Sequence, residues 1–204
     1  MTPWRKILYK ELSNLSLTGE VLDLGGSKKS GYHELLKGEH RVTVVNLDKE
    51  TGADLCFDLE KPFPIKDGEY DAVLCVNILE HISHYREFLG ECRRVLKPGG
   101  TLIVAVPFLV QVHPSPHDYF RYTGEALQKM LEEVDFKDIS IKPIGSGVGL
   151  AAAQLLYNAL RIQPLRILVE LLGKTFDSTV SLIKKENFLS GKNYPLGYVA
   201  ISER

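Results

Sequence analysis

The chain has 204 residues, of which 44% are hydrophobic, so residues 1–204 can bury the core of one globular domain. Its 25 basic and 26 acidic residues give a formal net charge of -1, which argues against nucleic acid as a partner. The three cysteines, Cys56, Cys75 and Cys92, are odd in number and lack the spacing of a zinc site, so we expect them to be reduced core residues.

The first predicted element is an amphipathic helix over residues 3–14, which has charges but no continuous apolar run. Such a start does not resemble a secretory signal, and we expect a cytoplasmic protein. Strand-like apolar runs then alternate with helix-like ones, which is typical of a parallel sheet flanked by helices. We expect strands at 20–24, 41–47, 53–58, 70–76, 101–106, 137–143 and 194–201, and helices at 83–97 and 125–134, the second capped by Thr123.

A helical insertion over about 148–190 precedes the last strand. It begins with two apolar helices within 148–172, joined at Pro164, and charged residues interrupt the run too often for a membrane span. The two helices could simply pack on the domain, or form a dimer interface, or contact a bilayer peripherally. Our hypothesis is that they cap the acceptor pocket and select an amphiphilic or lipid-linked acceptor, with a homodimer as the alternative.

The most informative segment is the first strand and the small residues that follow it. Asp23 stands within this strand, and Gly25, Gly26 and Ser27 allow a tight turn with close approach of a ligand. The second strand leads to Asp48, where nucleotide-binding α/β proteins place the acid that holds ribose hydroxyls. Two such strands imply an adenosine-type ligand.

With these motifs the chain resembles the class I S-adenosylmethionine-dependent methyltransferases. The resemblance covers about 20–142 plus the last strand, and rests on the segments 21–27, 46–48, 58–64, 70–82 and 96–102 taken together. It implies an α/β, Rossmann-like, seven-stranded and mostly parallel sheet with helices on both faces. It also implies S-adenosyl-L-methionine as the cofactor and methyl transfer as the activity.

The resemblance assigns roles to individual residues. The turn Gly25, Gly26 and Ser27 would lie under the amino-acid and ribose portions of the cofactor, and Asp23 would orient this turn or a water. The remaining cofactor contacts would be Asp48 to the ribose, Asp58 to the adenine amino group, Leu59 to the ring, and Asn77 to the methionine portion. Each acid also has a structural alternative: Asp48 and Asp58 could cap local turns, and Asp23 could be a satisfied strand-end acid.

The chain departs from the usual pattern at two places. Many relatives carry Gly-x-Gly-x-Gly, whereas Lys28 and Lys29 follow Ser27 here, either as surface residues or as contacts to the cofactor carboxylate. Asp135 stands where relatives usually have glycine, and aspartate tolerates the left-handed conformation.

Candidate catalytic residues follow the predicted strands. His81 and His117 are candidate general bases, although His81 could instead shape the pocket. His113, Tyr119 and Arg121 are candidate acceptor-site residues in the loop after the fifth strand, although Asp118 and Arg121 could pair structurally. No acid cluster suited to magnesium follows the fourth strand, so we expect no metal.

The acceptor is expected to be a small molecule, a sugar or a lipid-linked compound, methylated at oxygen or carbon. An Asn-Pro-Pro-aromatic element is missing after the fourth strand, and basic runs with aromatics are missing as well, which disfavours base or nucleic-acid methylation. Two alternatives stay open. The first is an NAD(P)-dependent oxidoreductase, and the second is a non-catalytic methyltransferase-like binding subunit.

Overall fold

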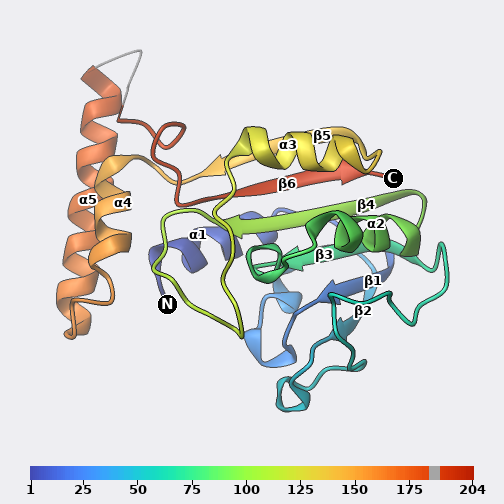
Figure 1. Cartoon of the computed structure of the whole chain (residues 1–204). Helices are drawn as coiled ribbons and strands as arrows, with labels where there is room; N and C mark the ends of the chain where they lie inside the picture. The colour runs from blue at the N-terminus through green and yellow to red at the C-terminus, as the bar shows by residue number, and fades with distance from the viewer. Residues whose placement is uncertain (184–188) are drawn as a thin grey trace.

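Six apolar runs form the strands of one sheet in the part of the chain that the computed structural model describes, residues 1–183 and 189–204. The strands are β1 (Gly19–Leu24), β2 (His40–Val45), β3 (Tyr70–Val76), β4 (Leu96–Pro107), β5 (Lys137–Ile144) and β6 (Gly197–Glu203). Their order is β2-β1-β3-β4-β6-β5, as Figure 1 shows. β1 to β4 are parallel, and β6 runs antiparallel to both β4 and β5. The mostly parallel α/β fold is therefore confirmed, with six strands instead of seven.

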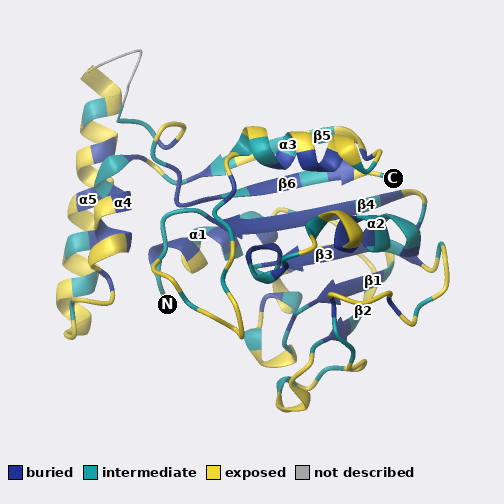
Figure 2. Cartoon of the chain, in the orientation of Figure 1, coloured by how far each residue is buried: buried dark blue, intermediate teal, exposed yellow. Residues whose placement is uncertain are grey.

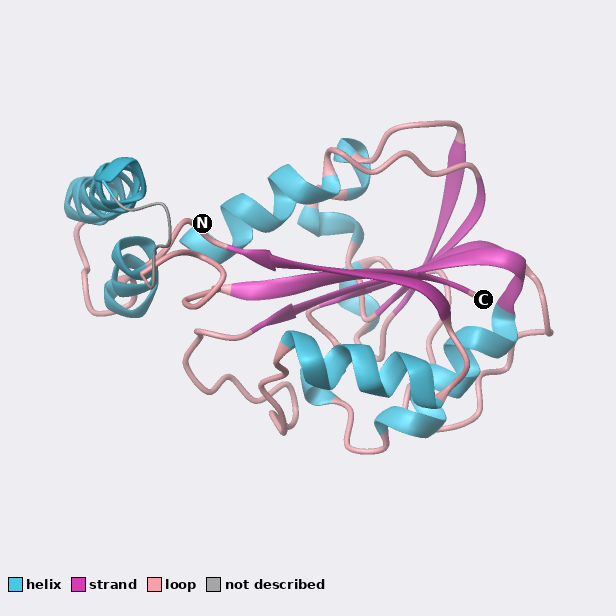
Figure 3. Ribbon diagram, turned by 90° about the horizontal axis from the view of Figure 1, so that it is seen from above, coloured by secondary structure: helices cyan, strands magenta, loops and turns pink. Residues whose placement is uncertain are grey.

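Helices cover both faces of this sheet (Figure 3). One face packs against α2 (Tyr85–Val95) and α3 (Gly124–Glu133), and its core includes Phe88 and Leu131. The other face packs against α1 (Pro3–Leu12), and the core there includes Leu8 together with Leu150 from the start of α4 (Val148–Leu156). Figure 2 shows that the central strands are buried, as parallel strands covered on both faces must be.

The strand predicted at 53–58 is wrong. Leu55 makes a single parallel bridge to Val45, and the Asp54 carboxylate accepts the backbone N–H of Val44 at 2.9 Å. The Asp54 side chain thus accepts the Val44 N–H, which would otherwise be available for pairing with a longer strand. Because no strand covers this edge of the sheet, Cys56 is exposed and the prediction of a core thiol is wrong for it, whereas Cys75 and Cys92 are buried.

The helix and strand ends around residue 100 also differ from the prediction. α2 ends at Val95, and β4 begins directly at Leu96 instead of at residue 101, so the Pro-Gly-Gly segment lies within the strand. The predicted cap of α3 is present, because the Thr123 hydroxyl accepts the N–H of Ala126 at 3.2 Å. Asp135 adopts a φ of 61°, as expected of an aspartate in place of glycine.

In its described residues the helical insertion forms α4 and α5 (Gln163–Ile183), which stand beyond the edge where β4 ends (Figure 1), and residues 184–188 of the predicted insertion lie outside the described part. α5 is longer than predicted, and Pro164 lies in its first turn and not between the two helices. The helices approach closely at Gly149 and Gly173, where a Cβ on Gly149 would lie 2.4 Å from the Gly173 carbonyl oxygen. No helix among the described residues is long and apolar enough to span a membrane.

We predict that Leu8→Ala lowers the free energy of unfolding by about 2–5 kcal/mol, because this fully buried side chain of α1 fills the core under the sheet. Urea unfolding followed by circular dichroism measures the change. Lys10→Ala, on the exposed face of the same helix, is the matched control and should leave the unfolding midpoint nearly unchanged. A loss below about 1 kcal/mol for Leu8→Ala would show that α1 is not part of the core.

Candidate functional site

The carboxyl ends of the parallel strands meet at one edge of the sheet, and a cavity of about 660 Å³ opens there. This first cavity has a volume within the range of small-molecule and cofactor sites. Seven of the residues predicted from the sequence line it: Gly25, Asp48, Asp58, Leu59, Asn77, His81 and His117. The strand topology therefore brings together residues that are far apart in the chain.

The turn after β1 accepts hydrogen bonds from the Asn46 side chain and packs directly over the Asp23 side chain. Gly25 has a φ of 75°, which favours glycine, and the Asn46 amide donates hydrogen bonds to the carbonyl oxygens of Gly25 and Gly26 at 3.1 and 2.8 Å. A Cβ on Gly26 would lie 1.7 Å from Asp23 Oδ2, so any residue other than glycine would clash with this carboxylate. Asn46 was not singled out from the sequence, although it stands in the same strand-end segment as Asp48.

Asp23 is fully buried beneath this turn. Its Oδ2 accepts the Tyr32 hydroxyl at 2.5 Å and lies 2.6 Å from His33 Nε2, whereas Oδ1 is buried and has no hydrogen-bond partner within residues 1–183 and 189–204. Burial raises the pKa of the Asp23 carboxyl, and the hydrogen bonds from His33 and Tyr32 oppose this rise. Asp23 is thus partly satisfied as a strand-end acid, and one oxygen remains able to accept a hydrogen bond.

Asp48 and Asp58, the two predicted acids that line the first cavity, both cap local turns. Asp48 Oδ1 accepts the N–H of Glu50 at 2.8 Å, and Asp58 Oδ1 accepts the N–H of Glu60 at 3.0 Å. The capping alternatives are therefore real, and both acids line the first cavity as well. Ser27 likewise caps a short 3₁₀ helix, where its hydroxyl accepts the N–H of Lys29 at 3.2 Å. Lys28 pairs with Asp54 on the surface.

A second cavity, of about 630 Å³, adjoins the first. Asn77, His81 and Ser115 line both cavities and so form their common boundary. The Trp4 indole N–H of α1 donates to Asn77 Oδ1 at 2.9 Å, and Asn77 itself has a φ of 53°. The sequence did not reveal Trp4 or Ser115 as site residues, because only the packing of α1 and of the loop after β4 brings them to this place.

The walls of the second cavity come from α1, the loop after β4, and α4. Its apolar residues include Trp4, Val110 and Leu155, and His113 lies among its polar residues. Tyr119 and Arg121, predicted as acceptor-site residues, line neither of these two cavities. Arg121 instead donates to both carboxylate oxygens of Asp118, at 2.5 and 2.7 Å, which is the structural pairing considered from the sequence.

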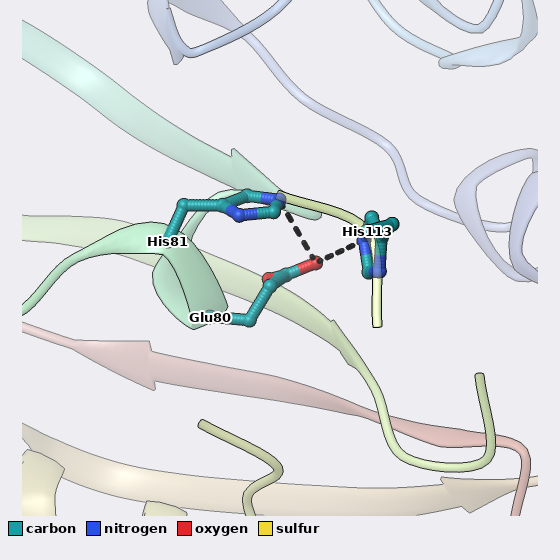
Figure 4. Close-up of side chains that lie close together, drawn as sticks. All are labelled: Glu80, His81 and His113. Carbon is teal, nitrogen blue, oxygen red and sulfur yellow. Dashed lines mark ion pairs between the residues drawn. The ribbon is translucent and has the colours of Figure 1, made fainter. Parts of the chain in front are cut away.

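Behind the boundary lies a buried carboxylate between two imidazoles (Figure 4). Glu80 Oε1 is 3.9 Å from His81 Nε2 and 3.9 Å from His113 Nε2, and the two rings meet edge to face. Burial raises the pKa of Glu80 to about 8 and lowers the pKa of His81. Sequence reasoning missed Glu80, although its place next to His81, just after a strand, was a usable signal.

The family whose model is described as "Methyltransferase domain" matches residues 22–104. A Mycolicibacterium smegmatis protein, described as a probable S-adenosylmethionine-dependent methyltransferase, is 24% identical over 161 residues, which cover 72% of this chain. This chain spans only 63% of that relative's length. A demethylmenaquinone methyltransferase of Tropheryma whipplei is 26% identical over 200 residues, covering 78% of this chain and 80% of that protein.

Among solved structures, an S-adenosylmethionine-dependent methyltransferase from Archaeoglobus fulgidus is similar in fold. It superposes with a TM-score of 0.62 at 16% identity, covering 98% of this chain and 94% of the other. At that identity the likeness concerns the fold alone. The matched segment includes Gly25, Asp48 and Asp58 of the first cavity, whereas Ser115, Pro116 and His117 of that cavity lie outside it.

We predict that Arg121→Ala lowers the free energy of unfolding by about 1–3 kcal/mol, because it leaves the buried Asp118 carboxylate with fewer hydrogen bonds. Thermal and urea unfolding measure this loss. Arg86→Ala is the control, since it breaks an exposed pair with Glu133 and should change stability little. Equal effects of both changes would show that the loop does not depend on the Asp118 pair.

Proposed function

We propose that this chain, a class I S-adenosylmethionine-dependent methyltransferase, binds its cofactor in the first cavity and methylates an acceptor held in the second. The observation that carries the proposal is the common boundary of the two cavities at Asn77, His81 and Ser115. A donor in one cavity and an acceptor in the other would meet at these three residues. Methyl transfer requires such an alignment of the two reactants.

The residues of the first cavity suit S-adenosyl-L-methionine. Gly25 lines this cavity with a φ of 75°, so the backbone of the turn would lie against the amino-acid portion, and Asp23 beneath the turn would orient it. Asp48 would accept hydrogen bonds from the ribose hydroxyls, because its cap uses only one hydrogen bond to Oδ1. Asp58 and Leu59 would contact the adenine, and Asn77 the methionine portion.

When bound, the cofactor supplies a methyl group already activated by the sulfonium. The protein's part is then chiefly to position the acceptor and to exclude water. If the acceptor atom is a hydroxyl oxygen, its proton would pass to an imidazole, and His81 and His117 both line the first cavity. The Nδ1 of His81 lies 2.5 Å from the carbonyl oxygen of His117, a contact that favours the tautomer with a free Nε2.

The acceptor we propose is amphiphilic. Trp4, Val110 and Leu155 give the second cavity an apolar wall, whereas Gln111 and Asn158 give it polar groups. The Tropheryma relative is named a demethylmenaquinone methyltransferase, and we propose a quinone-like or lipid-linked acceptor for this chain as well. α4 supplies Leu155, while α5 lines neither cavity, which supports α4 as the cap.

We predict that Asp48→Ala weakens the binding of S-adenosylhomocysteine at least about tenfold, through the loss of charge-assisted hydrogen bonds to the ribose. Isothermal titration calorimetry measures the affinity. Glu50→Ala, in the same 3₁₀ turn, is the matched control and should bind like the parent. Unchanged affinity for Asp48→Ala would remove the ribose role, and heat with NADH but not with S-adenosylhomocysteine would overturn the proposed function.

A second prediction concerns two neighbouring leucines of α4. Leu155 lines the second cavity and Leu156 lines neither, although both are partly exposed. With methyl-labelled cofactor and the organic-solvent extract of cells as acceptor source, Leu155→Ser should reduce incorporation severalfold, and Leu156→Ser should not. Cofactor affinity should stay the same in both variants. Equal incorporation by both would reject α4 as part of the acceptor site.

A further inference from the structure

We propose that Glu80, His81 and His113 form a binding site for one divalent metal ion behind the boundary of the two cavities. Each offers one ligand atom, and the three atoms lie within 4.8 Å of one another (Figure 4). Glu80 and His81 come from the turn after β3, and His113 from the loop after β4. The three donors thus come together only in the folded chain.

The hydrogen bonds of His81 and His113 orient both imidazole rings so that each Nε2 faces the Glu80 carboxylate. His81 Nδ1 lies 2.5 Å from the His117 carbonyl oxygen, and His113 Nδ1 lies 2.9 Å from the Gln111 carbonyl oxygen. A carbonyl oxygen only accepts, so each Nδ1 carries a proton, and the tautomer that this bond favours leaves Nε2 with a lone pair for a metal ion. Both Nε2 atoms face Glu80 Oε1. Metal-ligating histidines have this arrangement, with the other ring N–H bonded to a carbonyl oxygen.

The side-chain oxygens of Glu80 lack hydrogen bonds in the part of the chain that the structure describes. The residue is 0% exposed, and neither side-chain oxygen has a hydrogen bond among the described residues. The nearby cation Arg121 is engaged by both oxygens of Asp118. Leaving a buried carboxylate unpaired is costly, and metal coordination is one of the ways in which proteins satisfy it.

The separations suit a transition metal after a small contraction. Metal–ligand distances of about 2.0–2.2 Å place neighbouring ligands about 3.4 Å apart in a tetrahedral site. Glu80 Oε1 lies 3.9 Å from each imidazole nitrogen, and all three ligand atoms lie within 4.8 Å of one another. Imidazole donors favour zinc, iron or nickel over magnesium. The sequence predicted no metal because it shows neither a cluster of acids nor cysteines at zinc-site spacing, whereas this donor set has a single acid and two histidines 32 residues apart.

Three protein ligands leave coordination positions open for another donor. His81 lines both cavities and His113 lines the second, so an open position would face the acceptor. This inference rests on the proposed function. A metal ion at this site would select acceptors with a hydroxyl or similar oxygen donor, and His117 would then be the general base. The site thereby narrows the acceptor class within the proposed reaction.

The test uses full-length protein that has been stripped of metal with EDTA and then titrated with Zn²⁺ by calorimetry. Co²⁺ is used in parallel, with its visible absorption as a report on coordination. We expect one equivalent to bind, and at least tenfold weaker binding in Glu80→Gln and His113→Ala. His40→Asn is the control, because its imidazole also bonds a backbone carbonyl but lies outside both cavities. If Glu80→Gln does not fold, the half-exposed His113 still provides the test.

Absence of stoichiometric Zn²⁺ binding by the parent, or equal affinity in His113→Ala, would overturn the metal site. S-Adenosylhomocysteine is titrated separately into the metal-free parent, where we expect unchanged affinity. Cofactor binding without metal binding would reject the metal site and leave the proposed function standing. Metal binding that the two variants lose, together with no cofactor binding, would confirm the site and reject the function.

Discussion

The hydrogen bond from the Trp4 indole to Asn77 is the contact on which the arrangement of the two cavities depends. It connects α1, which packs on one face of the sheet, with the residue that directly follows β3. Asn77 adopts a left-handed φ, and its own N–H continues the pairing with β4 by donating to the Ala105 carbonyl oxygen at 2.8 Å. The boundary between the two cavities is therefore fixed by the helix and the sheet together, and not by a loop alone.

Three of the four buried acids among the described residues, Asp23, Glu80 and Asp177, have different numbers of hydrogen bonds. Asp177 accepts hydrogen bonds from the Ser146 hydroxyl and from the N–H groups of Gly149 and Leu150, and so fastens α5 to the start of α4. Asp23 receives both of its partners on one oxygen, and Glu80 receives none among the described residues. Asp177, whose two oxygens both accept hydrogen bonds, has a structural role. Asp23 and Glu80, which have oxygens without hydrogen bonds among the described residues, lie beside the cavities. The buried acids that lack hydrogen bonds thus lie next to the cavities in which we propose that methyl transfer takes place.

Local patterns were sufficient for the fold and for much of the first cavity. Apolar runs predicted six of the strands, and the strand-end positions of Gly25, Asp48 and Asn77 brought them together because parallel strands end at one edge. The strand at 53–58 failed because a side chain, that of Asp54, replaces part of the backbone ladder, which no periodicity reveals. Glu80 was missed for a similar reason. Its importance comes from its burial between His81 and His113, which is a property of the tertiary structure.

The position of β6 in the sheet has a consequence for synthesis on the ribosome. β5 pairs with β6 alone, and β6 separates it from β4, so β5 leaves the ribosome with no partner strand available. Residues 145–196, including both helices of the insertion, are made before β6 appears. At about 5–20 residues per second, the nascent chain carries an open edge at β4 for several seconds. During that interval the edge is a site for non-native pairing, and a chaperone that covers it would protect the unfinished sheet.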